Sequence, residues 1–492
     1  MKTNDKRREK PGEKKPNPLG ITVKKADDMP EWYGQVVTKA ELADYAPVKG
    51  CMIIRPHGYA LWQSIMDYFN RRLDEHHVKN AYFPLFIPES FFEKEAEHAK
   101  GFSPEVAWVQ NKDEGSQERL AIRPTSETIM YDAYARWIRS WRDLPLRINQ
   151  WCNIVRWEVS DVKLFLRSRE FLWQEGHCVY ETEEECDREV RIFLDEYTGL
   201  CEHLLALPVI AGRKTEKEKF AGAKYTTTIE AFMPDGKALQ CGTSHNLGQG
   251  FAKTFGISYV GKDEKEHHPW QNSWGISTRL IGATILMHGD DKGMVMPPAV
   301  AHTQGVIVPI YRDKDKEEVL AQAKKLSASL KGFSIVLDDR EGFSPGWKFN
   351  EWELKGIPVR IELGPRDIEK RSCVLVRRDT GEKKDVSWKT LNESFSTLLD
   401  AIQRSLFEKA KKHLEESIRK VTSYTQLKKA IGERRLVLAP FCGAISCEEK
   451  IKEDTGGATA RCIPFDQPAL GDHQCVACGK KAKHWAYFSK NY

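Results

Sequence analysis

The sequence predicts an α+β protein of three successive units. Over about residues 45–290, stretches with helical periodicity alternate with extended runs, as in an antiparallel sheet with flanking helices. After Pro297-Pro298, strand and helix patterns alternate over about 100 residues, which is typical of a smaller α/β domain. Five of the twelve cysteines then fall within the last 51 residues, which indicates a third, cysteine-rich unit.

Length, charge and hydropathy limit the class of protein. A chain of 492 residues allows about three domains of roughly 150 residues each. No run approaches ~18 apolar residues, so we expect no transmembrane helix, and the N-terminus lacks the apolar segment of a secretory signal, so we expect a cytoplasmic protein. Residues 1–25 carry nine Lys or Arg against three Asp or Glu. We expect residues 1–19 to form a disordered basic tail. The favoured interpretation is a solvated leader without a specific partner, and the alternative is a non-specific contact with RNA.

Three helices in the first unit are indicated by apolar residues three or four positions apart. Their apolar positions are Leu61, Ile65, Phe69 and Leu73; Met130, Tyr134, Trp137 and Trp141; and Val190, Leu194, Tyr197, Cys201 and Leu205. Extended runs at 147–158, 171–181, 224–232 and 238–245 alternate between polar and apolar residues, as antiparallel strands do.

The later units are predicted from the same signals. Strands are expected at 305–311, 333–338, 359–362 and 373–377, and helices at 316–330, near 347–354 and at 389–420. We therefore place the domains at 20–297, 298–405 and 406–492, after the tail at 1–19.

Any nucleotide site must depend on arginines, because the sequence has neither a G-x4-G-K-[ST] loop nor a strand-linked G-x-G-x-x-G. Arg156-Trp-Glu158 is predicted to lie on a strand, with Arg156 and Glu158 on one face. A basic loop containing Arg167 leads to the next strand, and such a hairpin could hold a triphosphate. Taken alone, Arg-x-Glu on a strand is more often a cross-strand ion pair.

Three segments in order resemble the motifs of class II aminoacyl-tRNA synthetases. The hairpin resembles motif 2, Gly275-Ile-Ser-Thr-Arg279 resembles motif 3, and residues 58–85 resemble motif 1. Arg123-Pro-Thr-Ser-Glu-Thr128 and Cys241-Gly-Thr-Ser-His-Asn-Leu-Gly248 closely resemble the prolyl-tRNA synthetases, in the layout of archaeal and eukaryotic members. The resemblance implies a class II catalytic domain, an α/β anticodon-binding domain and a small zinc-binding α+β domain at the C-terminus.

The resemblance also implies an activity. Members of this family convert L-proline and ATP to prolyl-adenylate and pyrophosphate, with Mg²⁺ bound to the ATP. They then transfer proline to the terminal adenosine of tRNA(Pro). The ionised carboxylate of proline needs no general base, so catalysis rests on positioning and charge stabilisation. Motif 1 of the family builds a homodimer, and no editing domain is expected in this chain.

The family's site residues carry over position by position. The ATP-binding residues implied are Arg156, Glu158, Arg167, Gln240, Thr243 and Arg279, of which Arg156 and Arg279 are also the catalytic residues. The proline-binding residues implied are Thr125, Glu127, Arg156, Trp173, Phe220 and His245. Without the resemblance, Thr125 or Ser126 would be interpreted as a helix N-cap, and Thr243 with His245 as an ordinary pair on one strand face.

Two further sites are predicted outside the catalytic unit. The resemblance assigns the anticodon to Arg340, Lys348, Glu351 and Arg366, although charges on such surfaces more often serve solubility. Neighbouring aromatic side chains could stack on unpaired bases. The four thiols of Cys442, Cys447, Cys475 and Cys478 match the number required for a tetrahedral, structural Zn²⁺ site.

Two alternatives remain at this stage. The first is another class II synthetase, such as a threonyl or glycyl enzyme, against which the Arg-Pro-Thr-Ser-Glu-Thr and Gly-Thr-Ser-His segments argue. The second is a non-catalytic, synthetase-like RNA-binding protein. Such proteins typically lose the ATP arginines, whereas Arg156, Arg167 and Arg279 are all present.

Overall fold

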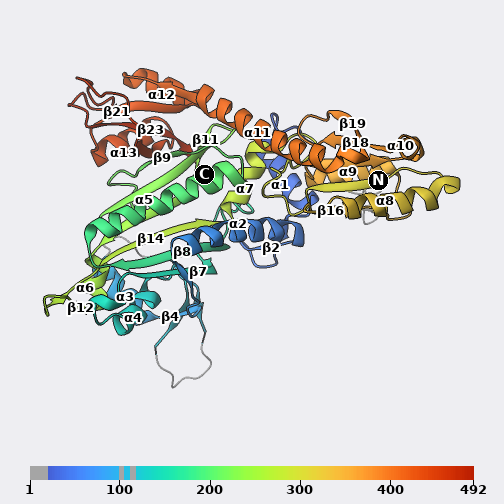
Figure 1. Cartoon of the computed structure of the whole chain (residues 1–492). Helices are drawn as coiled ribbons and strands as arrows, with labels where there is room; N and C mark the ends of the chain where they lie inside the picture. The colour runs from blue at the N-terminus through green and yellow to red at the C-terminus, as the bar shows by residue number, and fades with distance from the viewer. Residues whose placement is uncertain (1–19, 99–104, 111–117) are drawn as a thin grey trace, which may run out of the picture.

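The computed structural model of the chain describes residues 20–98, 105–110 and 118–492. The tail predicted for residues 1–19 lies outside them. Figure 1 shows a large sheet with helices in blue to green, an α/β part in yellow to orange, and an orange to red C-terminal part beside the large sheet. The predicted order of the three units is confirmed.

The large sheet has eleven strands in the described chain. Its centre is antiparallel, in the order β9 (Ile210–Arg213), β10 (Tyr225–Phe232), β11 (Lys237–Gly248), β14 (Trp270–Ser277), β8 (Glu170–Tyr180) and β7 (Leu146–Val155), with β3 (Lys79–Asn80) parallel to β7. Beyond β9 follow β22 (Thr459–Pro464), β23 (His484–Asn491), β21 (Leu436–Phe441) and β20 (Ile418–Lys420). The C-terminal unit therefore continues the catalytic sheet.

Helices cover the apolar face of this sheet. The helix α5 (Glu183–Gly199) begins at a capping box between Thr182 and Glu185 and packs on β10, β11 and β14. Phe193 of α5 stacks on Trp274 of β14, with the ring centroids 3.8 Å apart. On β8, a Cβ at Gly176 would lie 2.2 Å from the Trp274 ring, so only glycine allows this ring to cross the strand.

The other helices of this unit are α1 (Met29–Lys39), α2 (Pro56–Glu75), α3 (Glu89–His98), α4 (Glu127–Trp137), α6 (Gly250–Phe255) and α7 (Arg279–His288). Small strands complete it: β1 (Ala43–Tyr45), β2 (Met52–Ile54), β4 (Phe86–Pro88), β5 (Trp108–Val109), β6 (Leu120–Ile122), β12 (Tyr259–Val260) and β13 (Glu266–His267). In the part of the chain described, no helix is both long and apolar enough to span a membrane.

Most predicted elements of the first unit are present, with three corrections. The helix predicted to reach Trp141 ends at Trp137, because Ile138 is extended and Ser140 caps a separate 3-10 turn, η1 (Trp141–Asp143). The third predicted helix changes at Gly199 to a π-helical turn, η2 (Leu200–Leu204). The strand predicted to include Arg156 and Glu158 ends at Val155, because the chain turns there and Val159 N–H donates to the Arg156 carbonyl oxygen (3.4 Å).

The α/β part is a five-stranded sheet in the order β16 (Ile335–Leu337), β15 (Gly305–Pro309), β17 (Val359–Leu363), β18 (Ser372–Arg377) and β19 (Lys383–Ser387). Its helices are η3 (Asp313–Asp315), α8 (Lys316–Ser329), α9 (Pro345–Lys355) and α10 (Pro365–Lys370). The predicted strands and the helices predicted at 316–330 and near 347–354 are confirmed, whereas β19 and α10 were not predicted from the sequence. The helix predicted at 389–420 ends at Ser417, because Ile418 is extended and begins β20. β19 has charged residues at most positions, so it carries little apolar periodicity.

A long helix joins this part to the C-terminal one. After η4 (Trp388–Thr390), α11 (Leu391–Ser417) packs Phe395 and Ile402 into the α/β core and Leu414 against the C-terminal strands. The boundary proposed between residues 405 and 406 falls inside this helix. The C-terminal part adds α12 (Tyr424–Gly432) and α13 (Ile445–Asp454) around β20–β23.

Candidate active site and cysteine cluster

A cavity of about 270 Å³ opens over β8, β10, β11 and β14, near the starts of α4 and α7. Nine of the eleven predicted ATP- and proline-binding residues line it: Thr125, Glu127, Arg156, Trp173, Phe220, Gln240, Thr243, His245 and Arg279. These residues are spread over more than 150 positions of the sequence. The sheet brings them together, because neighbouring strands present their side chains to the same face.

The other two predicted residues lie outside the cavity lining. Glu158 is exposed in the turn after β7, and Arg167 is exposed at the end of the motif 2 loop. This loop closes on itself, since Lys163 N–H donates to the Arg167 carbonyl oxygen (2.7 Å) and Arg167 N–H donates back to Lys163 (2.8 Å). Their contact with ATP stays a prediction.

Arg156 and Arg279 are the two guanidinium groups of the cavity. Arg279 donates to the carbonyl oxygens of Leu166 (3.2 Å) and Gln240 (3.3 Å). Burial lowers the pKa of both arginines, and the charge of Arg156 lowers that of Arg279 further. Within residues 118–492, neither forms an ion pair with a carboxylate at 4.0 Å or less, so both can bind an anionic ligand.

Thr125 and Glu127 lie at the start of α4, where both side chains are buried. The Thr125 hydroxyl donates to the Glu127 carboxylate. Ser126 occupies the N-cap position but makes no side-chain capping bond, and its hydroxyl instead accepts from Gln150 Nε2 (3.2 Å). The polar side chains at the start of α4 therefore bond to one another and to neighbouring cavity residues, and the Ser126 side chain does not cap the helix.

Sequence reasoning missed Glu175 and His177 as site residues, although both line the cavity. They lie on the same face of β8 as Trp173, and this alternation is the signal that could have identified them. His177 Nε2 lies 3.0 Å from Glu175 Oε2, while Gln150 Nε2 donates to Glu175 Oε1 (2.9 Å) and the Tyr131 hydroxyl lies 3.1 Å from His177 Nδ1. Each polar atom of the pair thus has a defined partner.

This pair holds opposite charges in the interior. Burial alone lowers the pKa of His177, but its hydrogen bond to Glu175 and the nearby Glu127 charge outweigh burial, so the pKa is raised. Burial alone raises the pKa of Glu175, but the bond to His177 reverses the direction. The cavity therefore has an anchored ion pair beside Glu127.

An apolar wall faces this pair. The rings of Phe220 and His245 lie 5.0 Å apart, and the Thr226 hydroxyl accepts from Phe220 N–H (2.9 Å) and lies 2.9 Å from His245 Nδ1. Burial, followed by the charges of His177 and Lys214, lowers the pKa of His245 to about 3. A neutral imidazole beside a phenyl ring suits a compact apolar group. Lys214, Glu218 and Thr226 also line the cavity and were not predicted.

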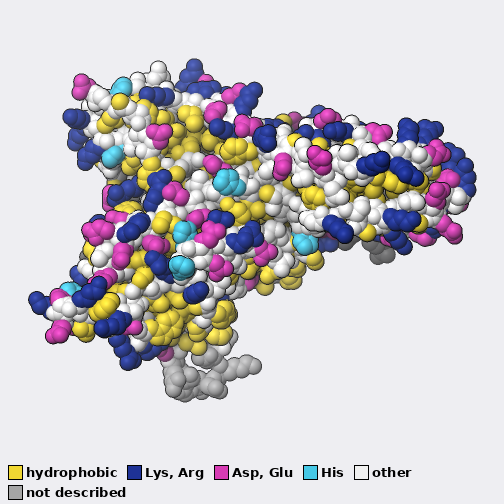
Figure 2. Space-filling view, in the orientation of Figure 1, with side chains coloured by type: hydrophobic (Ala, Val, Ile, Leu, Met, Phe, Trp, Pro, Cys, Tyr) yellow, Lys and Arg dark blue, Asp and Glu magenta, His cyan; other side chains and the backbone are white. Residues whose placement is uncertain are grey.

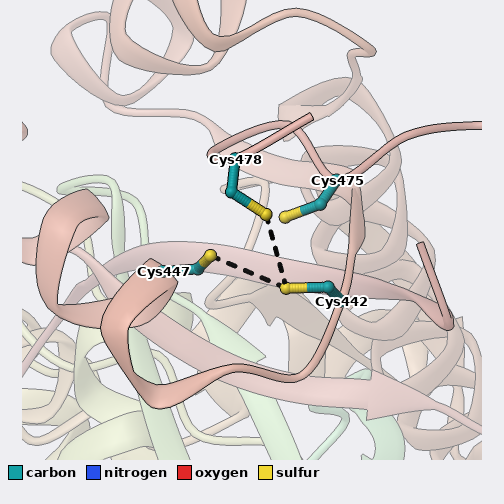
Figure 3. A group of neighbouring side chains, drawn as sticks. All are labelled: Cys442, Cys447, Cys475 and Cys478. Carbon is teal, nitrogen blue, oxygen red and sulfur yellow. Dashed lines mark hydrogen bonds between the residues drawn. The ribbon is translucent and has the colours of Figure 1, made fainter. Parts of the chain in front are cut away.

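The four predicted metal-binding thiols come together at the far end of the C-terminal part. Cys442 and Cys447 follow β21, and Cys475 and Cys478 precede β23, which is antiparallel to β21. Figure 3 shows the sulfur atoms pointing toward one another, and all four lie within 4.8 Å of each other. The Sγ of Cys442 is 3.6 Å from that of Cys447 and 3.8 Å from that of Cys478. A tetrahedral Zn²⁺ with bonds of ~2.3 Å requires sulfur separations of ~3.8 Å, so the cluster fits this ion.

Three of the four predicted anticodon residues form one cluster in the α/β part. Arg340 donates to Asp338 through Nε (2.8 Å) and Nη2 (2.7 Å) and to Glu351 through Nη2 (2.5 Å). Lys348 Nζ donates to the Asp338 carbonyl oxygen (2.9 Å). Arg366 is exposed on α10 and makes no contact with this cluster among the interactions of the described residues.

Each of the three units matches a known family of domains. Residues 108–288 match the family described as tRNA synthetase class II core domain (G, H, P, S and T), residues 304–398 match the anticodon binding domain, and residues 424–492 match the prolyl-tRNA synthetase C-terminal domain. A proline–tRNA ligase of Alkaliphilus oremlandii is 52% identical over 468 residues, which is 94% of this chain and 96% of that protein.

The chain belongs to the prolyl-tRNA synthetase family. Proline–tRNA ligase 2 of Clostridioides difficile is 50% identical over 96% of this chain and 98% of its own length. Proline–tRNA ligase of Natranaerobius thermophilus is 51% identical over 92% of this chain and 94% of its own. The family and the class II fold predicted from the motifs are thus confirmed.

Proposed function

We propose that the chain is a proline–tRNA ligase that forms prolyl-adenylate from L-proline and ATP and then esterifies tRNA(Pro). The observation that carries the proposal is the composition of the cavity. It combines two arginines, neither of which pairs with a carboxylate of the described residues, with a buried Thr125–Glu127 pair. It therefore offers cations for phosphates and oxygen acceptors for an ammonium.

In the first step, a carboxylate oxygen of proline attacks the α-phosphorus of ATP, and the bond from that phosphorus to the pyrophosphate oxygen breaks. Arg156 would bind the α-phosphate and the attacking carboxylate, and Arg279 the γ-phosphate side. Mg²⁺ arriving with ATP would neutralise phosphate charge, with Gln240 among its neighbours, while Thr243, Glu158 and Arg167 complete the proposed ATP contacts. In the second step, a hydroxyl of the terminal adenosine attacks the proline carbonyl and AMP leaves.

Selection of proline follows from the other side of the cavity. The secondary ammonium of proline has two N–H donors, which Thr125 and Glu127 can accept. Trp173, Phe220 and His245 would enclose the ring, and larger side chains would overpack this space. The Glu175–His177 pair lies opposite the Phe220–His245 wall and is itself fixed, because Glu175 is held by Gln150 and His177 by Tyr131.

The remaining units would bind tRNA and stabilise the fold. We assign catalysis to residues 20–297, anticodon binding to the α/β part with the first half of α11, and a structural Zn²⁺ to the C-terminal part that follows α11. In the second unit, the Arg340–Glu351 cluster borders Phe343 and Trp347, whose rings stack with centroids 4.1 Å apart. Phe343 is exposed and Trp347 half-buried. Accessible aromatic rings next to fixed charges suit unpaired bases, with Arg340, Lys348, Glu351 and Arg366 as the proposed readers.

A homodimer formed through motif 1 is supported by the surface. Tyr59 on α2, Tyr82 before β4 and Phe86 on β4 are all exposed, and they lie within or beside the motif 1 segment. Figure 2 shows hydrophobic side chains gathered over the region of β4 and α4. Apolar patches of this kind mark protein interfaces. Since its substrates are ATP and tRNA, we expect the enzyme to act in the cytoplasm.

Amino-acid-dependent exchange of pyrophosphate into ATP, run with each of the twenty amino acids, tests the function directly. Proline should give the strongest exchange by a wide margin. A stronger response to threonine or glycine would assign another class II specificity. No exchange with any amino acid, in folded protein that binds tRNA, would favour a non-catalytic RNA-binding protein.

A further inference from the structure

The C-terminal unit reaches the catalytic cavity through the edge of the large sheet. β22 pairs with β9, with Ile463 opposite Arg213 and Pro464 opposite Gly212. A Cβ at Gly212 would lie 2.5 Å from the Ile463 carbonyl oxygen, so glycine permits this close approach. The same short strand β9 ends immediately before Lys214, which lines the cavity.

Across this junction lies a buried triad of charges made by Lys214, Glu230 and Arg461, each of them 4% exposed. Arg461 donates to Glu230 Oε2 through Nε (3.1 Å) and Nη2 (2.9 Å). Lys214 Nζ and the Thr228 hydroxyl donate to the other oxygen, Oε1, at 2.7 and 2.9 Å. Arg461 therefore binds one oxygen of the Glu230 carboxylate with two donors, and Lys214 and Thr228 bind the other oxygen.

Two β-bulges aim these side chains. On β22 the register shifts between Ala460 and Cys462, so Arg461 is the extra residue. Between β10 and β11 the register shifts after Ile229, so Cys241 is the extra residue on β11 and Glu230, the first residue after the shift, lies opposite Gln240. Bulges redirect side chains next to active sites, and here two of them converge on one carboxylate.

The triad connects to the apolar wall of the cavity in two steps. The backbone N–H of Lys214 donates to the Thr226 carbonyl oxygen (2.8 Å). The Thr226 hydroxyl in turn joins Phe220 N–H and His245 Nδ1, both at 2.9 Å. A displacement of Lys214 would therefore move the wall that faces the proposed proline ring.

We propose that Arg461 is a positioning residue for the proline site, acting from the C-terminal unit through Glu230 and Lys214. Without Arg461, Glu230 keeps a buried oxygen with no partner, and Lys214 is drawn toward both oxygens and away from its present place. The wall at Thr226, Phe220 and His245 then loses its alignment. The triad acts on Arg279 through charge, but the hydrogen bonds of Arg279 to the Leu166 and Gln240 carbonyl oxygens do not involve it. This inference rests on the proposed function.

The test is steady-state exchange kinetics of the full-length Arg461→Met, Arg461→Lys and Arg419→Met proteins. Arg419 is the matched control, because it is exposed in the same unit and donates only to the carbonyl oxygens of Glu416 and Ile418. Arg461→Met should raise the KM for proline about tenfold, within the range for residues coupled in one salt-bridge network, and change the KM for ATP less than about twofold. Arg461→Lys, which keeps the charge, should raise it about threefold.

Counting active sites from the burst of adenylate formation separates positioning from unfolding. A purely structural role would lower the active fraction and leave both KM values of the remaining enzyme unchanged, and that result would overturn the proposal. If Arg461→Met does not fold, the Arg461→Lys protein tests the proposal instead. A proline KM of Arg461→Lys equal to that of the unaltered protein would contradict the positioning role of Arg461. If the unaltered protein shows no proline-dependent exchange, the proposed function fails first.

Discussion

Arg279 begins α7, and within the described residues its guanidinium donates to two carbonyl oxygens, those of Leu166 (3.2 Å) and Gln240 (3.3 Å). Such neutral contacts orient a guanidinium without neutralising it. Glu127, by contrast, is placed beside the Thr125 hydroxyl and near the His177 charge. At the scale of single residues, the cavity therefore separates a cationic side for phosphates from an anionic side for an ammonium.

Replacement of Arg279 tests this separation. Arg279→Ala should lower the exchange rate by at least ~10²–10³, the cost of losing one preorganised group that stabilises developing charge. Thermal unfolding should change little, since no buried carboxylate loses its partner. Arg404→Ala, at an exposed position of α11, is the control and should keep full activity. Exchange within tenfold of the unaltered protein would contradict the role of Arg279.

A buried histidine predicts a pH dependence of stability. Burial lowers the pKa of His288 to about 4, although its Nε2 lies 2.9 Å from the Leu205 carbonyl oxygen. The unfolded chain takes up a proton near pH ~6.5 and the folded chain does not, so stability falls as the pH drops below ~6.5, by about 2 kcal/mol at pH 5. In His288→Gln this part of the loss should disappear, as measured by urea unfolding at pH 7 and pH 5. His203→Gln, at an exposed site, should retain it.

At the scale of elements, the cysteine cluster is assembled where the ends of two neighbouring strands meet. The antiparallel pair β21 and β23 places Phe441 opposite His484, so the segments that follow one strand and precede the other meet. The cysteine cluster forms there, next to the start of α13. A metal in this place would tie three segments of the C-terminal part together.

Removal of the metal should therefore act on stability. Metal analysis should find about one zinc per chain, the stoichiometry of a closed four-thiolate site. Cys442→Ser with Cys475→Ser should lower the unfolding temperature, because metal-binding energy is folding energy. Exchange at saturating proline should survive in the soluble fraction. Complete loss of exchange in folded, dimeric protein would instead indicate a catalytic metal.

At the scale of the whole molecule, the eleven-stranded sheet joins the N-terminal and C-terminal units, and α11 joins the C-terminal unit to the α/β part. Arg378 and Asp290 add an ion pair between the α/β part and the catalytic unit, with nitrogen–oxygen distances of 2.7 Å. The units are thus connected in a ring of contacts. The exposed motif 1 surface is the one that we propose for a homodimer.

Sedimentation should show a homodimer at concentrations that give full exchange. Tyr59→Asp with Phe86→Asp should shift the chain toward the monomer, because each charge would enter the apolar interface proposed for motif 1. Phe465→Asp, at an exposed position of the C-terminal unit, is the comparison outside this surface and should leave the oligomeric state unchanged. A fully active monomer of the unaltered chain would contradict the proposal.

The enzyme should also charge tRNA(Pro) with alanine and fail to remove it. Alanine is smaller than proline, and a missing methylene in an apolar site limits discrimination to roughly 10–200-fold. Between Arg167 and Arg279, an interval described throughout, the chain forms β8, α5, η2, β9–β11, α6 and β12–β14, which build and border the cavity. Purified enzyme should accumulate alanyl-tRNA, and added alanyl-tRNA should decay only at its spontaneous rate. Rapid deacylation by this chain alone would reveal an editing site.

The sequence by itself determined the family, the order of the units, most helices and the four clustered thiols. These features have local signals: apolar residues at helical spacing, as in Leu61 to Leu73, short motifs such as Arg123 to Thr128, and paired cysteines. Nine of the eleven residues predicted to bind ATP or proline line one cavity. They could be predicted from the sequence because they lie inside recognisable motifs.

Only the tertiary structure decided which further residues complete the site. Gln150 and Tyr131 hold the Glu175–His177 pair, and Arg461 meets Glu230 across 231 positions of the sequence. Such contacts arise from strand pairing and bulges between distant segments, which leave no pattern in either segment alone. Turns were misjudged for a related reason: the chain leaves β7 after Val155 because it turns there, with Val159 N–H donating to the Arg156 carbonyl oxygen (3.4 Å), and the residue pattern alone does not show this turn.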